Sequence, residues 1–164
     1  MSNYIDVADL VGTAVQRFQD ATDAFDEAAA GKLGINRTDL RCLSIVSRTT
    51  QLAASALAAA AGLSRGAATS AIDRLENAGL LRRTPSREDR RSVLISMTLA
   101  GMKAVDEIWG RLIEESRSRL SAWDPADLLI VTRFLDEAAS FQAEMAAGLG
   151  RGREDRSSNA SGSR

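Results

Sequence analysis

The stretch from Gly62 to Thr98 constrains the fold more than any other part of the chain. Ser64 can cap the free N–H groups of a first helical turn, so a short helix is expected from Ser64 to Ala78. Gly79 can adopt the left-handed conformation that commonly ends a helix. Four apolar residues recur at helical spacing and form the expected inward stripe of this helix: Ala68, Ala71, Ile72 and Leu75.

Two short runs with strand character follow this helix, from Leu80 to Thr84 and from Ser92 to Thr98. The second run alternates apolar and other residues and is well supplied with β-branched side chains, as in a strand. The segment between the runs begins with proline and is rich in charge, which predicts a hairpin loop. A helix followed by a hairpin with an arginine-bearing tip is typical of a winged helix-turn-helix. Such a helix fits the DNA major groove, and such a tip reaches the backbone or the minor groove.

Charge is distributed unevenly along the chain. The formal net charge of the whole sequence is −1, which on its own disfavours a nucleic-acid-binding protein. Residues 64–92, however, contain seven arginines and four acidic residues, a net charge of +3, so the remainder carries −4. A basic surface on an acidic body is suited to steering a polyanion toward one face. The alternative is that Arg82 and Arg83 form only a solvated strand edge.

The sequence from Leu63 to Gly101 resembles the recognition helix and wing of the MarR family of bacterial transcription regulators. The most specific part is Asp89-Arg90-Arg91-Ser92-Val93, followed by Leu-x-x-Thr-x-x-Gly ending at Thr98 and Gly101. The match covers residues 35–113 in pattern. The chain differs from many members just before the Asp-Arg-Arg motif, where it has Ser86-Arg87 in place of an Asp-Pro-like turn.

The resemblance implies a homodimeric repressor that binds double-stranded DNA at a pseudo-palindromic operator. In that role, we expect base-edge contacts from Arg65, Thr69 and Ser70. Phosphate contacts are expected from Arg74, Arg82, Arg83 and Arg90. We expect Arg91 to enter the minor groove and Asp89 to support the wing arginines. A winged-helix module that binds proteins and not DNA is the alternative interpretation.

The resemblance also implies release from DNA by a small aromatic or lipophilic effector bound between the DNA-binding part and the dimerisation helices. Phe18, Cys42 and Trp109 are the candidate residues for that pocket, although packing in the protein's own core is the favoured explanation for each. Cys42 lies beside the apolar face of a helix expected to run to about Ser47. We interpret it as a small buried hydrophobe and not as a redox sensor, because a sensor needs an accessible thiol of low pKa.

Three further helices are expected to build a dimerisation layer around the winged domain, which makes the fold mainly α with a small β-wing. They are predicted over residues 4–30, 99–120 and 125–147, with the winged helix-turn-helix over residues 35–98. The first has a heptad-like apolar seam from Tyr4 to Ala29 with one polar break at Thr22. That seam equally fits packing on the protein's own core. Residues 1–147 therefore form one expected unit, and residues 148–164, rich in Gly, Ser and charge, are expected to be a disordered tail.

Composition disfavours other classes of protein. The chain has no histidine and one cysteine, so the commonest general base is missing and an intrachain disulfide cannot form. We find no nucleotide-binding glycine motif, metal-ligand cluster or nucleophile–base pair, which argues against an enzyme and predicts neither cofactor nor metal. No apolar run is long enough to span a bilayer, and no signal-like segment is visible, so a cytoplasmic protein is expected.

Overall fold

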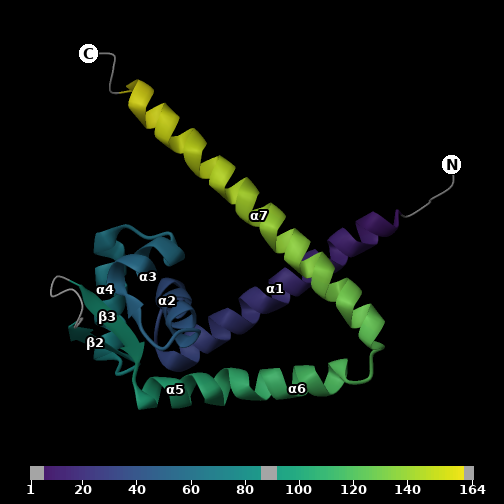
Figure 1. The fold of residues 1–164 in the computed structure, drawn as a ribbon, viewed down its shortest axis with the longest axis horizontal. Coiled ribbons are helices and arrows are strands. Elements are labelled where there is room, and N and C mark those ends of the chain that lie inside the picture. Colours follow the sequence, from purple (N-terminus) through teal and green to yellow (C-terminus); the bar gives the residue numbers. More distant parts are fainter. Residues whose placement is uncertain (1–5, 86–91, 161–164) are drawn as a thin grey trace. The chain divides into compact units, whose positions relative to one another are not determined.

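A computed structural model describes the backbone of residues 6–85 and 92–160 and the side chains of residues 6–85 and 92–149. The chain divides into two compact units, Met1–Leu112 and Ile113–Arg164. Figure 1 shows that helices dominate the fold, with one small sheet in the first unit. The prediction of a mainly α protein with a β-wing is confirmed.

The first two helices begin and end where their sequence dictates. Helix α1 spans Val7–Leu33, and the side chain of Asp6 accepts a hydrogen bond from the Ala8 amide at its N-terminus. Gly34 ends this helix in the left-handed conformation with φ of 66°. Helix α2 spans Arg37–Ser47 and is capped by Asn36, whose side chain accepts from the Asp39 amide at 2.9 Å.

The helix-turn-helix follows a two-residue strand. Strand β1 is Leu52–Ala53, helix α3 is Ala54–Ala61, and helix α4 is Arg65–Asn77. Ala53 takes the cap position of α3, and no side chain bonds there. Gly62 makes the turn between the helices with φ of 63°.

The wing is the antiparallel hairpin of β2, Leu81–Pro85, and β3, Val93–Met97. Strand β3 is central, because the sheet order is β1-β3-β2. Ile95 pairs with Leu52 on one side and with Arg83 on the other. The two-residue strand before the helix-turn-helix therefore belongs to the wing sheet.

One apolar core ties the helix-turn-helix to the wing. Leu43 of α2, Leu75 of α4 and Ile95 of β3 are at most 1% exposed and belong to a single buried cluster. A second, smaller cluster joins α1 to α2 through Ala29, Ala30 and Leu40, and half-buried Phe25 and Trp109 pack against it. The inward stripe predicted for α4 is buried, as expected.

The helix after the wing contains an irregular turn that the sequence pattern did not reveal. Helix α5, Leu99–Val105, is followed by η1, Asp106–Gly110, which is a π-helical turn, and then by α6, Arg111–Leu120. Thr98 caps the start, since its hydroxyl accepts from the Gly101 amide at 2.9 Å. A Cβ on Gly101 would lie 2.2 Å from the Leu80 carbonyl oxygen, so this position requires glycine.

Helix α7 runs from Pro125 to Ala160, well beyond the predicted end at Ala147. The disorder expected from Gly148 onward is therefore wrong for residues 148–160. No proline interrupts the segment, and an established helix propagates more easily than a new one nucleates, which explains the continuation. Residues 161–164 lie outside the described part. None of the helices described is long and apolar enough to cross a membrane.

Candidate nucleic-acid interface

The outward face of helix α4 carries the residues predicted to contact base edges. Arg65, Thr69 and Ser70 are all exposed, whereas the opposite stripe of the helix is buried. The Thr69 hydroxyl donates to the Arg65 carbonyl at 2.9 Å, so its oxygen retains acceptor capacity. Ser64 accepts from the Ala67 amide at 3.2 Å and fixes the first turn. The cap and the buried stripe together aim the exposed side chains away from the core.

Arg74, predicted to meet a phosphate, lies instead in a two-pronged ion pair with Asp39. Its Nε donates to Asp39 Oδ2 at 2.8 Å and its Nη2 to Asp39 Oδ1 at 2.7 Å. Asp39 is only 1% exposed, while about half of the Arg74 side chain remains exposed. The hydrogen bonding of Arg74 to the Asp39 carboxylate is the main cause that raises the pKa of Arg74, so the guanidinium keeps its charge.

Sequence reasoning did not single out Asp39. Its carboxylate comes from the first turn of α2 and its partner lies 35 residues later, so no local pattern links them. The only hint is that helical spacing places position 39 beside apolar Leu43, where an acid needs a partner. The pair joins α2 to α4 across the helix-turn-helix.

The two arginines at the start of the wing have different surroundings. Arg83 donates to the carboxylates of Asp73 and Glu76 on α4. Desolvation acts against its charge, but the bonds to these two acids outweigh it and raise the pKa of Arg83. Arg82 is exposed, and its Nε donates to the buried Ser96 hydroxyl at 3.1 Å within the hairpin.

The remaining wing predictions concern the tip. Arg90, Arg91 and the supporting Asp89 lie outside the described residues. Strand β2 ends at Pro85 and β3 starts at Val93, which is the hairpin framework that the sequence predicted for this tip.

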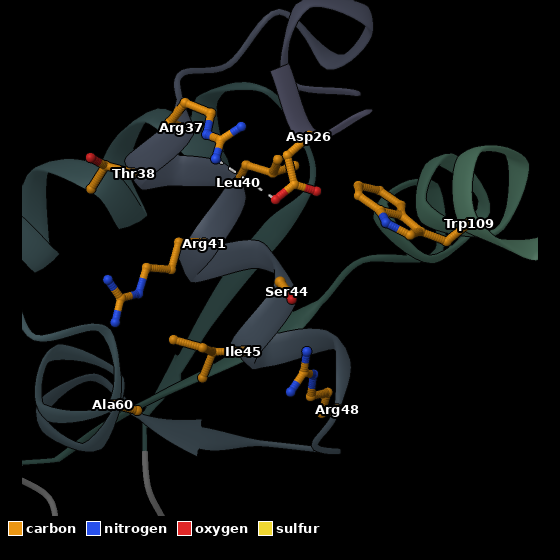
Figure 2. A pocket seen from close by; sticks show the side chains of 10 residues that line it. All are labelled: Asp26, Arg37, Thr38, Leu40, Arg41, Ser44, Ile45, Arg48, Ala60 and Trp109. Atoms are coloured by element: carbon orange, nitrogen blue, oxygen red, sulfur yellow. Dashed lines mark ion pairs between the residues drawn. The ribbon is translucent and has the colours of Figure 1, made fainter. Parts of the chain in front are cut away.

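A cavity of about 600 Å³ lies beside helix α2 (Figure 2). Trp109, a predicted pocket residue, lines it and also packs edge-on against Phe25, with ring centroids 6.1 Å apart. Figure 2 shows several lining side chains spaced along α2, with Trp109 on a separate helix. Three arginines line the cavity: Arg37 and Arg41 of α2, and Arg48 directly after that helix.

One of these arginines is already paired. Arg37 donates to the carboxylate and the backbone carbonyl of Asp23, each at 2.7 Å, and approaches Asp26 at 4.0 Å. Across residues 6–85 and 92–149, neither Arg41 nor Arg48 forms an ion pair. The cavity therefore has cationic groups that are available to an anion.

The other two predicted pocket residues lie elsewhere. Cys42 is fully buried in the main core, and burial is the first cause that raises the pKa of its thiol. Such a thiol stays protonated and unreactive at neutral pH. Phe18 is 66% exposed on α1, beside a separate shallow depression. The structure does not bring Phe18, Cys42 and Trp109 together.

The described residues contain no group of three or more side chains suited to holding a metal ion.

Comparison with known proteins supports the geometry. Residues 35–93 match the model of the MarR family. The chain is 32% identical, over 84% of its length and 91% of the relative, to YcgE of Bacillus subtilis strain 168, an uncharacterised HTH-type transcriptional regulator.

Solved structures share the fold. RV1404 from Mycobacterium tuberculosis has a TM-score of 0.65 and 22% identity, covering 85% of this chain and 95% of its own. NadR in complex with 4-hydroxyphenylacetate has a TM-score of 0.60 and 22% identity, covering 85% and 96%. The exposed recognition helix, the paired wing and these likenesses lead to one conclusion: the chain belongs to the MarR family of transcriptional regulators, which bind DNA.

Proposed function

We propose that this regulator represses transcription as a homodimer bound to a pseudo-palindromic operator. The observation that carries the proposal is the contrast between the two faces of α4, one buried and the other presenting Arg65, Thr69 and Ser70. These three side chains contact base edges in the major groove. A two-fold dimer presents two such helices, which sets the half-sites about 10 base pairs apart.

The wing supplies the sequence-independent contacts. Arg82 and Arg90 meet phosphates, and Arg91 inserts into the minor groove with Asp89 as its support, as the Asp-Arg-Arg motif implies. Arg74 has a weaker claim to a phosphate, because Asp39 uses its Nε and Nη2 and leaves Nη1. Arg83 is more fully engaged, because it donates to two carboxylates.

Selection of bound fragments from the source genome, followed by footprinting, tests the proposal. We expect two related half-sites, and Arg65→Ala should weaken operator binding by about 1–3 kcal/mol and relax specificity at one base pair. Arg133→Ala, on exposed α7, is the matched control and should leave DNA affinity unchanged. Binding to a single asymmetric half-site, or no DNA selected at all, would contradict the proposal, and the second outcome would favour a protein-binding module.

We further propose that the effector is a small aromatic anion held in the cavity of Figure 2. The support is the presence of Trp109 with Arg41 and Arg48 around about 600 Å³, a volume that suits a small organic ligand. A relative of the same fold, NadR, is in complex with an aromatic carboxylate, 4-hydroxyphenylacetate. The carboxylate pairs with arginine, and the ring packs on Trp109.

Titration with a panel of aromatic carboxylates, 4-hydroxyphenylacetate first, tests the effector. A binder should raise the melting temperature and lower operator affinity. Arg41→Gln should weaken that binding, whereas Arg117→Gln, on an exposed face of α6, should not. If uncharged analogues bind as tightly as the anions do, the anionic class is wrong.

A further inference from the structure

Arg83 of strand β2 is attached to the recognition helix by four hydrogen bonds. Its guanidinium donates to the carboxylates of Asp73 and Glu76 and, at 3.4 Å, to the carbonyl of Thr69. Its own backbone N–H donates to Glu76 Oε1 at 3.2 Å. Main chain and side chain of one wing residue therefore both hold α4, and they do so over two helical turns. A residue whose only role was to bind phosphate would not need this arrangement.

The charges around Arg83 give the attachment a second effect. Asp73 and Glu76 are 53% and 39% exposed, on the same helix that carries the base-reading residues, whereas Arg83 is only 29% exposed. Two uncompensated carboxylates beside a DNA backbone would repel its phosphates. Arg83 covers both acids with one cation and so removes most of that repulsion.

The position of Arg83 in the sheet explains how the attachment controls the wing. Its partner in the ladder is the fully buried Ile95 of the central strand β3, so the residue is fixed on the sheet side as well. Among the described residues, the side chain of the neighbouring Arg82 donates only to Ser96 of the same hairpin. Arg83, and not Arg82, thus links the wing to the recognition helix.

We propose that Arg83 is a positioning residue that locks the wing to the recognition helix, and that it does not itself contact DNA. Operator binding needs the major-groove helix and the wing tip at a fixed separation, and the Arg83 clamp, defined as Arg83 with Asp73 and Glu76, sets that separation. This inference rests on the DNA binding proposed above and assigns Arg83 a different role from the phosphate contact expected from the sequence.

Glu76→Gln provides the sharpest test. Glu76 could act only as a negative charge near DNA or could hold the wing, and these two roles predict different outcomes. Affinity is measured for the operator duplex and for an unrelated duplex of equal length. If Glu76 is only a negative charge near DNA, its removal raises both affinities together and leaves their ratio unchanged, which would overturn the proposal. If it holds the wing, the ratio falls about tenfold, equivalent to about 1.4 kcal/mol. Asp73→Asn, which removes the other arm of the clamp, should change the ratio in the same direction.

Salt dependence then separates Arg83 from a phosphate ligand. Arg83→Gln should weaken operator binding, and Arg83→Lys should restore little, since one ammonium cannot bridge two carboxylates as a guanidinium fork does. In the Asp73→Asn/Glu76→Gln background, where no carboxylate is left uncompensated, Arg83→Gln should leave the salt slope unchanged. Arg82→Gln is the matched control and should lower the slope by about one unit. A one-unit fall for Arg83→Gln, with recovery in Arg83→Lys, would make Arg83 a phosphate contact.

Hydrogen exchange keeps the inference separate from the proposed function. In the double variant Asp73→Asn/Glu76→Gln, the amides of β2 should exchange faster than in the wild type, with an unchanged melting profile for the core. If the wild type binds no DNA, the proposed function fails and the clamp has no DNA to position. If DNA binding persists but the amides of β2 and the specificity ratio do not change, only the clamp inference fails.

Discussion

The winged helix-turn-helix and helix α7 use apolar side chains in opposite ways. In the winged part, Leu43, Leu75 and Ile95 are at most 1% exposed within one closed core. On α7, Leu135 is 48% exposed and Phe141 is 62% exposed in the single chain. An apolar stripe left in water is costly. The winged part is packed within itself, and we propose that α7 packs against a second copy of the chain.

Polar side chains also differ between the winged part and α7. Among the described side chains, no buried nitrogen or oxygen lacks a hydrogen-bond partner, and the most buried acid, Asp39, is paired with Arg74. Over residues 125–149 of α7 the charged side chains are exposed, and the Arg133–Glu137 pair, at 3.9 Å, is of the weak surface kind. Substitutions in the first region should thus change stability, and those in the second should change assembly.

The largest expected effect is in the core. Leu75→Ala should reduce the free energy of unfolding by about 2–5 kcal/mol, because Leu75 is fully buried and the cavity left behind cannot collapse completely. Urea denaturation measures it. Leu149→Ala, at a residue 76% exposed on α7, is the control and should change stability by less than about 0.5 kcal/mol. Equal losses would remove the distinction between the two regions.

Next in size is the effect of a charge on the apolar face of α7. Leu135→Glu should raise the dimer dissociation constant about 100-fold, or ~2.7 kcal/mol, because the carboxylate would be buried without a partner in the dimer. Ser140→Glu adds the same charge on the opposite face and should have little effect. Sedimentation over a range of concentrations distinguishes the variants. A wild type that stays monomeric at micromolar concentration would refute the dimer itself.

A smaller loss is expected where the helix after the wing begins. Gly101→Ala should destabilise the protein by about 1–3 kcal/mol, since the new Cβ would lie 2.2 Å from the Leu80 carbonyl oxygen and the backbone must move. Gly148→Ala meets no atom within 4 Å and lies within α7, so it should stabilise that helix slightly. Thermal melts of both variants provide the comparison, and a neutral Gly101→Ala would mean that the close approach relaxes freely.

The smallest effect concerns pH. Burial raises the pKa of the Cys42 thiol in the folded state, so folding favours the protonated form. Stability is unaffected below the unfolded thiol pKa of about 8.5 and falls as pH rises above it, by at most about 1.4 kcal/mol per pH unit. The fall between pH 7 and pH 9.5 should be smaller in Cys42→Ala. Rapid alkylation of the native protein at pH 7 would show instead that the thiol is accessible.

Features that depend on neighbouring residues were predictable from the sequence. The cap at Ser64, the stop at Gly79 and the alternation in the second wing strand each work within a few residues, and each is confirmed. The assignment to the MarR family followed from these local features and the Asp-Arg-Arg motif.

Features that depend on contacts distant in sequence were not predictable. The Asp39–Arg74 pair spans 35 residues, and the attachment of Arg83 to α4 exists only once the hairpin has folded back on that helix. An arginine in a basic stretch looks the same in sequence whether it faces a phosphate or a carboxylate of its own protein. The extension of α7 was missed because composition describes an isolated segment and not one that continues an existing helix.

The π-helical turn at Asp106–Gly110 affects how this chain must be compared with others. A π turn contains one residue more than the α-helical turn that it replaces, so every position after it is rotated by about 100° relative to an uninterrupted helix. A gapless alignment with a relative that lacks the turn would therefore equate residues on different faces of α6. A one-residue gap placed within 106–110 restores the correspondence, and deleting one residue there, which would convert the π turn to an α turn, should leave α6 presenting the same face.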